Sequence, residues 1–264
     1  MKNRTLKPNT VLTIAGSDSG GCAGIQADLR VFHNLEVHGM SAVTCITAQN
    51  TMGISQVLCL PSGIIAAQIN SVLADIGCGS AKSGMLGNRS IVRTVARAAA
   101  RWKIRNLVVD PVMVSSTGTA LLKRDAIYAL RDDLIPLACL VTPNLAEAER
   151  LTEKPVRTIQ AMERAAETIF RSTGCPALVK GGHRTGPALD VFFDGSRLLR
   201  ISRVRIRTRH NHGSGCTLSA AIAAFLARGE PMEKAIVKAK DYVTEALRTG
   251  YSVGKGRGPL GNVE

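Results

Sequence analysis

The segment from Arg209 to Thr217 places two glycines and a cysteine just before a long apolar run. Gly213 and Gly215 stand where a loop is expected to enter a helix. The first backbone N–H groups of a helix have no partner within it and attract anions, and glycines let a phosphate approach them closely. Cys216 shares this position, where the pKa of a thiol tends to fall. An anion cradle that holds a base predicts phosphoryl transfer to a hydroxyl group.

The elements that must position this segment alternate between strands and helices along the chain. Apolar runs predict strands at 10–15, 41–48, 56–60, 80–85, 107–110, 140–142 and 177–180, and then a hairpin with a type I′ turn at Asp194-Gly195. Helical periodicity predicts helices at 24–35, 62–76, 90–101, 123–134, 159–173, 217–228 and 232–249. We therefore expect an α/β protein with three α/β/α layers, a mostly parallel central sheet and a small β flap at 56–60. Because no linker or repeat divides the chain, we expect one domain over residues 1–264.

Several residues with useful chemistry stand at or just past the expected strand ends. They are Gly16, Gln49, Met85, Asp110, Asn144 and Lys180. In open α/β sheets, ligands bind beyond the carboxyl ends of the strands. The spacing therefore predicts that these residues line one ligand site.

The segment around Cys216 resembles the Thr-His-Gly-Thr-Gly-Cys-Thr signature of hydroxymethylpyrimidine (phosphate) kinases, in the ribokinase-like superfamily. The resemblance continues through residues 15–21, 48–51, 82–86, 110–113, 142–145 and 179–183, and ends at 253–256. It implies a ribokinase-like kinase domain that uses ATP and Mg²⁺. The chain departs from the family pattern at His210-Asn211, where Asn-Thr is usual, and at Ser214, where Thr is commoner.

On the substrate side, the resemblance makes the loop around Gly16 and Asp18 part of a pyrimidine site. By themselves these residues indicate only a tight strand-to-helix turn. Gln49 matches the family's main recognition residue, and its amide can donate to a heterocycle edge and accept from it. Met85 and Val112 would form the apolar walls, although either could equally be ordinary core.

On the nucleotide side, Asn144 and Glu147 stand three residues apart at a helix start, so their side chains point the same way. Glu147 could simply cap this helix. The resemblance instead implies an Asn-x-x-Glu element that arranges Mg²⁺ and water around the phosphates, with Asp110 assisting. Magnesium keeps several waters and needs few protein ligands. Lys180 would bring an ammonium to the phosphates, and Gly182 would let them approach.

Cys216 decides the expected mechanism. Sugar kinases of the superfamily usually carry Asp here, and a cysteine resembles the pyrimidine and pyridoxine branch, so the thiolate is the implied base. Gly213, Ser214 and Gly215 would present backbone N–H groups to the moving phosphoryl group. A loose phosphoryl-transfer transition state depends more on such positioning than on the base.

Composition limits the partners and the compartment. The net charge is +14, but the arginines at 89, 93, 97, 101 and 105 and at 203, 205 and 207 have the spacing of solvated faces. No aromatic residues interleave with them, so we do not expect nucleic-acid binding. The seven cysteines include no Cys-x-x-Cys pair, which indicates reduced thiols in the cytoplasm. No apolar run is long enough for a membrane span, and no secretory signal is expected.

The sequence therefore predicts an ATP-dependent kinase of thiamine biosynthesis. It would phosphorylate 4-amino-5-hydroxymethyl-2-methylpyrimidine and then convert the monophosphate to the diphosphate. The resemblance also makes a homodimer expected, paired through the flap. One alternative is a pyridoxine or pyridoxal kinase, whose ligand is also a flat heterocycle bearing CH2OH. Another is a catalytically idle binding or regulatory protein, against which the joint presence of Cys216, Glu147 and Lys180 argues.

Overall fold

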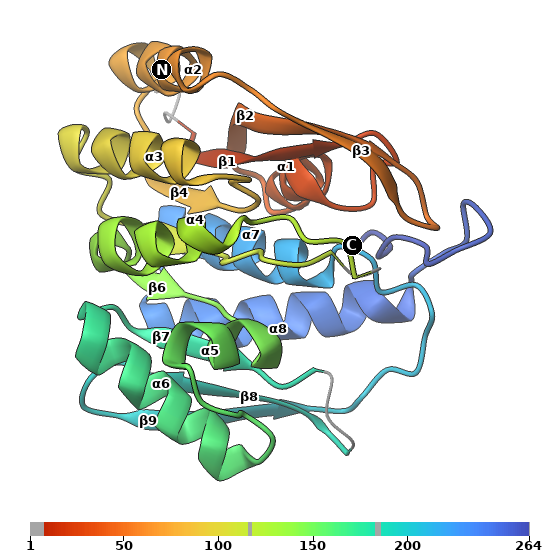
Figure 1. The fold of residues 1–264 in the computed structure, drawn as a ribbon. Coiled ribbons are helices and arrows are strands. Elements are labelled where there is room, and N and C mark those ends of the chain that lie inside the picture. Colours follow the sequence, from red (N-terminus) through yellow and green to blue (C-terminus); the bar gives the residue numbers. More distant parts are fainter. Residues whose placement is uncertain (1–7, 116–117, 183–185, 264) are drawn as a thin grey trace, which may run out of the picture.

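A computed structural model describes residues 8–115, 118–182 and 186–263. Its strands form one nine-stranded sheet with the order β3-β2-β1-β4-β5-β6-β7-β8-β9 (Figure 1). The strands are β1 (Thr10–Asp18), β2 (His38–Gln49), β3 (Ile54–Cys59), β4 (Ser80–Ser83), β5 (Leu107–Val109), β6 (Leu140–Val141), β7 (Ala177–Lys180), β8 (Ala188–Phe193) and β9 (Leu198–Arg203). The six strands from β2 to β7 in this order are parallel. Strands β3, β8 and β9 are antiparallel and form the two edges.

Helices cover both faces of this sheet, so the expected three-layer α/β/α arrangement is confirmed (Figure 1). One face carries α1 (Gly24–Asn34), α7 (Ser214–Ala227) and α8 (Met232–Arg248). The other carries α2 (Ser62–Asp75), α3 (Arg89–Arg101), α4 (Arg124–Ala129), α5 (Leu145–Thr152) and α6 (Ile159–Thr173). Among the described residues, no helix has both the length and the apolarity needed to cross a membrane.

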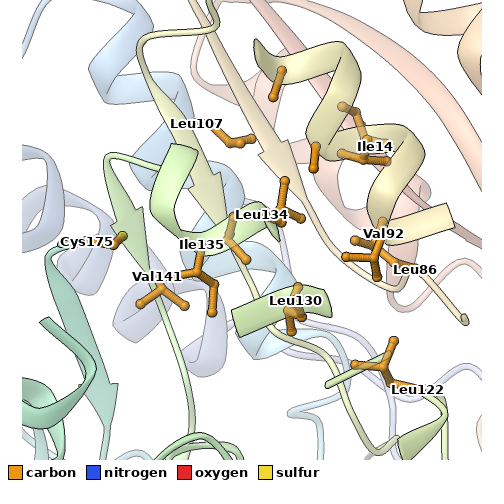
Figure 2. Packing of buried hydrophobic residues seen from close by; sticks show 14 of the residues in the cluster. Ile14, Leu86, Val92, Leu107, Leu122, Leu130, Leu134, Ile135, Val141 and Cys175 are labelled. Carbon is orange, nitrogen blue, oxygen red and sulfur yellow. The ribbon is translucent and has the colours of Figure 1, made fainter. Parts of the chain in front are cut away.

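Two apolar cores result, because successive strand side chains point to opposite faces. Leu107 and Val109 of β5 join the core beneath α2 to α6, whereas Val108 between them joins the core beneath α1, α7 and α8. Figure 2 shows part of the first core, where Leu134 and Ile135 lie against the side chains of the sheet. Helix α7 is almost entirely buried from Thr217 to Leu226, which explains why that stretch of the sequence is apolar all round.

Three local expectations are wrong in detail. The helix expected at 123–134 is regular only in α4; a π-helical turn at Leu130–Leu134 and a 3₁₀ turn at Ile135–Leu137 follow it. Pro136 lies in that last turn, where the missing N–H cannot continue an α-helix. The hairpin turn has a positive φ at Gly195 but not at Asp194 or Ser196, so it is not the expected type I′ turn, which needs a positive φ at both central residues.

The arginine-bearing strand expected around residue 205 also differs. Strand β9 ends at Arg203, so Arg205 and Arg207 lie in the following loop. The guanidinium of Arg205 donates to the carbonyl oxygens of Gly182 and Gly186, both at 2.6 Å. Arg205 therefore supports a loop at the cavity described below and is not part of a regular solvated strand face.

Candidate active site

A cavity of about 620 Å³ opens at the carboxyl end of the parallel strands. It is lined by every residue that the sequence analysis singled out as a site candidate, namely Gly16, Asp18, Gln49, Met85, Asp110, Val112, Asn144, Glu147, Lys180, Gly182, Gly213, Ser214, Gly215 and Cys216. Of the matched motif at 179–183, His183 lies outside the described residues. The structure thus brings together groups that are up to 200 residues apart in the chain.

Helix α7 begins three residues earlier than expected, at Ser214, so Cys216 lies within its first turn. Gly213 is the N-cap residue, with a left-handed φ of 83°. A Cβ added at Gly213 would collide with the carbonyl oxygen of Cys22, so only glycine allows the α7 start to pack against this loop. The positive end of the α7 dipole consequently faces the cavity, as an anion site requires.

One side of the cavity is lined by three charged side chains, those of Asp110, Glu147 and Lys180. Lys180 at the end of β7 donates to Asp110 Oδ1 at 2.9 Å, and Ser219 Oγ lies 3.3 Å from Asp110 Oδ2. Burial alone would lower the pKa of Lys180, but the carboxylates of Asp110 and Glu147 outweigh it and raise that pKa. Lys180 therefore offers a permanent positive charge at the cavity wall.

Glu147 closes a capping box at the start of α5. Its Oε2 accepts from the Asn144 backbone N–H at 2.7 Å, and Asn144 Oδ1 accepts from the Glu147 N–H at 3.0 Å. The capping role that the residues alone suggested is therefore real. The pKa of Glu147 is raised to about 7, because burial and the Asp110 carboxylate raise it by more than Lys180 and the backbone hydrogen bonds lower it. Two neighbouring carboxylates with this repulsion fit a hard divalent cation, because such a cation prefers oxygen ligands and would relieve the repulsion.

The opposite side of the cavity is built for a flat, partly polar ligand. Gly16 lies at an irregularity of β1, where the pairing with β2 shifts between Ala15 and Ser17. A Cβ at Gly16 would sit 3.2 Å from Met85 Sδ, so these two residues form one wall.

The Gln49 amide stands at the end of β2 with its orientation already fixed. Its Oε1 lies 3.1 Å from Thr47 Oγ1, and its Nε2 lies 3.1 Å from His212 Nε2. His212 is 5% exposed, and burial lowers its pKa, so the imidazole is neutral. His212 was not predicted as a site residue, although it stands in the glycine-rich signature.

Asp18 contributes to the cavity indirectly. Its Oδ1 accepts from the Gly20 N–H at 2.8 Å, and its Oδ2 accepts from the N–H groups of Cys22 and Ala23 at 3.0 and 2.8 Å. The carboxylate is thus occupied in shaping the loop that leads into α1. Asp18 therefore holds the wall of the site through this loop, and its direct contact with a substrate stays a prediction.

The expected lowering of the Cys216 pKa is wrong. The pKa of this thiol is raised to about 11, mainly by burial and in addition by the carboxylates of Asp28 and Asp110. Lys82 and a hydrogen bond from the Gly24 backbone amide act in the other direction. The helix N-terminus is present as predicted, but the sequence did not reveal how much protein would surround the sulfur.

Two charged residues were not predicted as part of the site, Lys82 in the cavity wall and its partner Asp28 behind it. Lys82 is the middle of the short buried strand β4, and Asp28 lies on the buried face of α1. Their side chains are both 0% exposed and form an ion pair with an N–O distance of 2.9 Å. A lysine in a buried strand and an aspartate on an apolar helix face were the available signal, since such charges are almost never buried unpaired.

The comparisons with known proteins agree with this geometry. Residues 18–261 match the model of the family described as phosphomethylpyrimidine kinase. The hydroxymethylpyrimidine/phosphomethylpyrimidine kinase of Rhizobium meliloti (strain 1021) is 48% identical over 253 residues, which cover 94% of this chain and 95% of that protein. Among solved structures, a phosphomethylpyrimidine kinase from Clostridium difficile 630 has 40% identity and a TM-score of 0.81 and covers 90% of this chain and 99% of its own.

A second similar solved structure is a complex with ligands. The pyridoxal kinase from Staphylococcus aureus in complex with AMP-PCP and pyridoxal has 33% identity and a TM-score of 0.88, with coverage of 96% of this chain and 93% of its own. The fold is therefore that of the ribokinase-like kinases. Taken with the matched family model and the closely similar relative, these findings show that this chain is a phosphotransferase that belongs to the phosphomethylpyrimidine kinase family.

Proposed function

We propose that this chain acts as one kinase domain that transfers the terminal phosphoryl group of ATP to the hydroxymethyl group of 4-amino-5-hydroxymethyl-2-methylpyrimidine. A second transfer would convert the monophosphate to the diphosphate for thiamine biosynthesis. The observation that carries this proposal is the single cavity in which the α7 start, the Lys180 ammonium and the Gln49 amide converge. A hydroxyl held beside Gln49 and a phosphate held at α7 would meet near Cys216.

The nucleotide would lie on the side of Lys180 and Gly182. Lys180 would attract its phosphates, and Asn144 and Glu147 would fix the loop before α5 around them. Mg²⁺, when bound by Asp110 and Glu147 with water, would neutralise phosphate charge. The chain's own contribution is placement, since the loose transition state of phosphoryl transfer is accelerated mainly by positioning and charge stabilisation.

Cys216 would accept the hydroxyl proton as the new O–P bond forms and the bond to the leaving diphosphate breaks. Its raised pKa means that only a small fraction is thiolate at neutral pH. That fraction can suffice because the hydroxyl loses its proton late in a loose transition state. The backbone N–H groups of the first α7 turn would hold the transferring group meanwhile.

Pyridoxal phosphorylation is the second candidate, and the structural similarity to pyridoxal kinases favours it. We expect a mass-spectrometric assay with Mg-ATP and each heterocycle to give the pyrimidine monophosphate and then the diphosphate. Phosphorylation of pyridoxal alone would overturn the thiamine assignment, and no phosphorylated product with either heterocycle would favour the idle binding protein.

Gln49→Ala should weaken pyrimidine binding and leave ATP binding nearly unchanged, because it removes one partner of a buried hydrogen bond to the ring. Such a loss costs about 1–3 kcal/mol, which is roughly a 5- to 150-fold rise in the dissociation constant. Isothermal titration of each ligand measures this. Gln160→Ala, at an exposed position on α6, is the matched control and should change neither constant. Equal losses for both ligands would remove Gln49 from the recognition role.

The proposed role of Cys216 predicts how the single-turnover rate depends on pH. If the thiolate is the base, the single-turnover rate should climb as pH rises from neutral, because a pKa of about 11 leaves more thiolate at each step. Cys216→Ala should lower the rate by about 10²–10⁴-fold and abolish this climb. Cys216→Asp should recover part of the rate with a flat profile, because a carboxylate is ionised throughout.

Cys78→Ala is the control for this series. Burial also raises the pKa of the Cys78 thiol to about 11, but Cys78 does not line the cavity. It should keep both the rate and its dependence on pH. Full turnover in Cys216→Ala would exclude the thiolate as base and leave the backbone cradle as the catalytic device.

We further propose a homodimer formed through the flap, which consists of strand β3 and the residues 45–49 of β2 that pair with it. Ile46 and Leu58 lie directly opposite each other on its two strands and are 46% and 62% exposed. Strand β3 is an edge strand with free backbone groups on its outer side, where a second copy can pack.

The cysteines are free thiols, which supports a reducing compartment such as the cytoplasm.

Leu58→Glu should convert the dimer to a monomer, because a carboxylate would be buried in the apolar contact. Light scattering at several protein concentrations measures the mass. Val237→Glu, on the exposed side of α8, is the control and should remain dimeric. A wild-type mass of one subunit at every concentration would contradict the dimer.

A further inference from the structure

The ion pair between Lys82 and Asp28 forms part of the structure behind the cavity wall. Lys82 Nζ lies 3.1 and 2.9 Å from the two carboxylate oxygens of Asp28, and both side chains are 0% exposed. The Thr13 hydroxyl donates to Asp28 Oδ2 at 2.6 Å. The carboxylate is thus held from two sides, and the ammonium is fixed at one place beside the cavity.

The neighbouring backbone leaves room for this ammonium. A Cβ at Gly84 would lie only 2.8 Å from Lys82 Nζ and 3.0 Å from the Cβ of Ala15. Burying two charges costs several kcal/mol for each ion, and apolar residues of similar volume are often at least as stabilising as a buried pair. Stability alone therefore gives little reason for a charged pair at this position.

The fold also brings the pair to the catalytic cysteine. Lys82 and Cys216 line the same cavity. Asp28 lies one turn after Gly24 on α1, and the Gly24 backbone amide is the hydrogen-bond donor that acts on the Cys216 thiol. Helix α1 packs directly on α7. The pair and the thiol consequently belong to one rigid contact between β4, α1 and α7.

Four charged groups act on the Cys216 thiol from the elements around it. Lys82 on β4 and Lys180 on β7 favour the thiolate, whereas Asp28 on α1 and Asp110 after β5 oppose it. Burial alone would lower the pKa of Lys82, but Asp28, Cys216 and Asp110 raise it, so the ammonium keeps its proton. In the proposed function Lys180 binds the nucleotide phosphates, whereas no ligand is assigned to Lys82.

We propose that Lys82 is a positioning residue whose ammonium stabilises the thiolate of Cys216, and that Asp28 holds this ammonium in place and moderates its effect. In this scheme the Cys216 thiol first releases its proton to solvent. The thiolate beside Lys82 then takes the proton of the substrate hydroxyl. The inference deepens the proposed role of Cys216 as base and depends on that role only for its consequence on turnover.

Two single variants test the proposal because they break the same ion pair and should move the thiol in opposite directions. Lys82→Met removes the positive charge and should raise the apparent pKa of Cys216 by about one unit or more. Asp28→Asn removes the negative charge and should lower it. Lys82→Arg keeps the charge and should stay nearer to the wild type than Lys82→Met does.

The measurement is the rate at which iodoacetamide alkylates Cys216 across a range of pH in the full-length protein without substrates. Mass spectrometry of the peptide that contains Cys216 separates this site from the other six cysteines. Lys82→Met should react about tenfold more slowly than the wild type at neutral pH, because one pKa unit changes the thiolate fraction tenfold. Asp28→Asn should react faster.

A second buried pair provides the control. Lys240 Nζ lies 2.6 Å from Asp190 Oδ2, with side chains 10% and 3% exposed. Both residues line the same cavity, but neither is among the groups that shift the Cys216 thiol. Lys240→Met and Asp190→Asn should lower the melting temperature, as we also expect of Lys82→Met and Asp28→Asn. They should leave the alkylation profile of Cys216 unchanged.

A purely structural role would loosen the site in the same way in both variants of the pair. Shifts of Lys82→Met and Asp28→Asn in the same direction, or no shift in either, would therefore overturn the proposal. If Lys82→Met does not fold, Asp28→Asn alone tests the proposal. The proposal is then overturned if the apparent pKa of Cys216 does not fall in Asp28→Asn. Single-turnover profiles of the same variants separate the two claims. A thiol that shifts as expected while the turnover profile does not follow it would refute the base role and leave the charge effect intact.

Discussion

The burial of charge around the first turn of α7 is the constraint on which the rest of this site depends. Two ion pairs lie there, Lys82 with Asp28 and Lys180 with Asp110. Charges can be held at such depth only when each has a fixed partner, because an unpaired buried charge costs far more than any contact around it returns. The strands, α1 and α7 therefore have little freedom to move relative to one another.

The same arrangement bears on the proposed base role of Cys216. Burial makes the Cys216 thiolate unfavourable, and the Lys82 ammonium and the backbone hydrogen bond from Gly24 oppose that effect. The α7 start also presents backbone N–H groups to the cavity, so one element would supply both the proposed base and the proposed anion site. The close approach of Gly213 to the loop at Cys22 keeps that element in place.

The two sides of the cavity differ in their chemistry. The side proposed for the nucleotide contains carboxylates, a lysine and the capped start of α5, all of which suit phosphate and a divalent cation. The other side contains Gly16, Met85 and an oriented Gln49 amide, which suit a flat heterocycle. A pyrimidine and a pyridine with CH2OH groups fit this description almost equally, which agrees with the similarity to both kinds of kinase.

Much of this could be predicted because the information is local in the chain. Alternating strand and helix patterns gave the layers, and residues at strand ends, such as Gln49 and Lys180, gave the candidate site. Within an element the errors came from short-range detail: Gly195 alone has positive φ in its turn, and a π-helical turn follows α4. Backbone geometry of that kind depends on what the segment packs against, so a pattern of residue types does not reveal it.

The sequence by itself determined the fold class, the family and fourteen of the residues that line the cavity. Only the tertiary structure decided the electrostatics of that cavity. Asp28 and Lys82 are 54 residues apart and look like isolated charges in apolar segments. Their ion pair exists only after folding. The same is true of the opposite effects of Asp28 and Lys82 on the pKa of Cys216 and of the hydrogen bond between Gln49 and His212. The physical reason is that a pKa depends on burial and on charges nearby in space, and neither is a property of neighbours in the sequence.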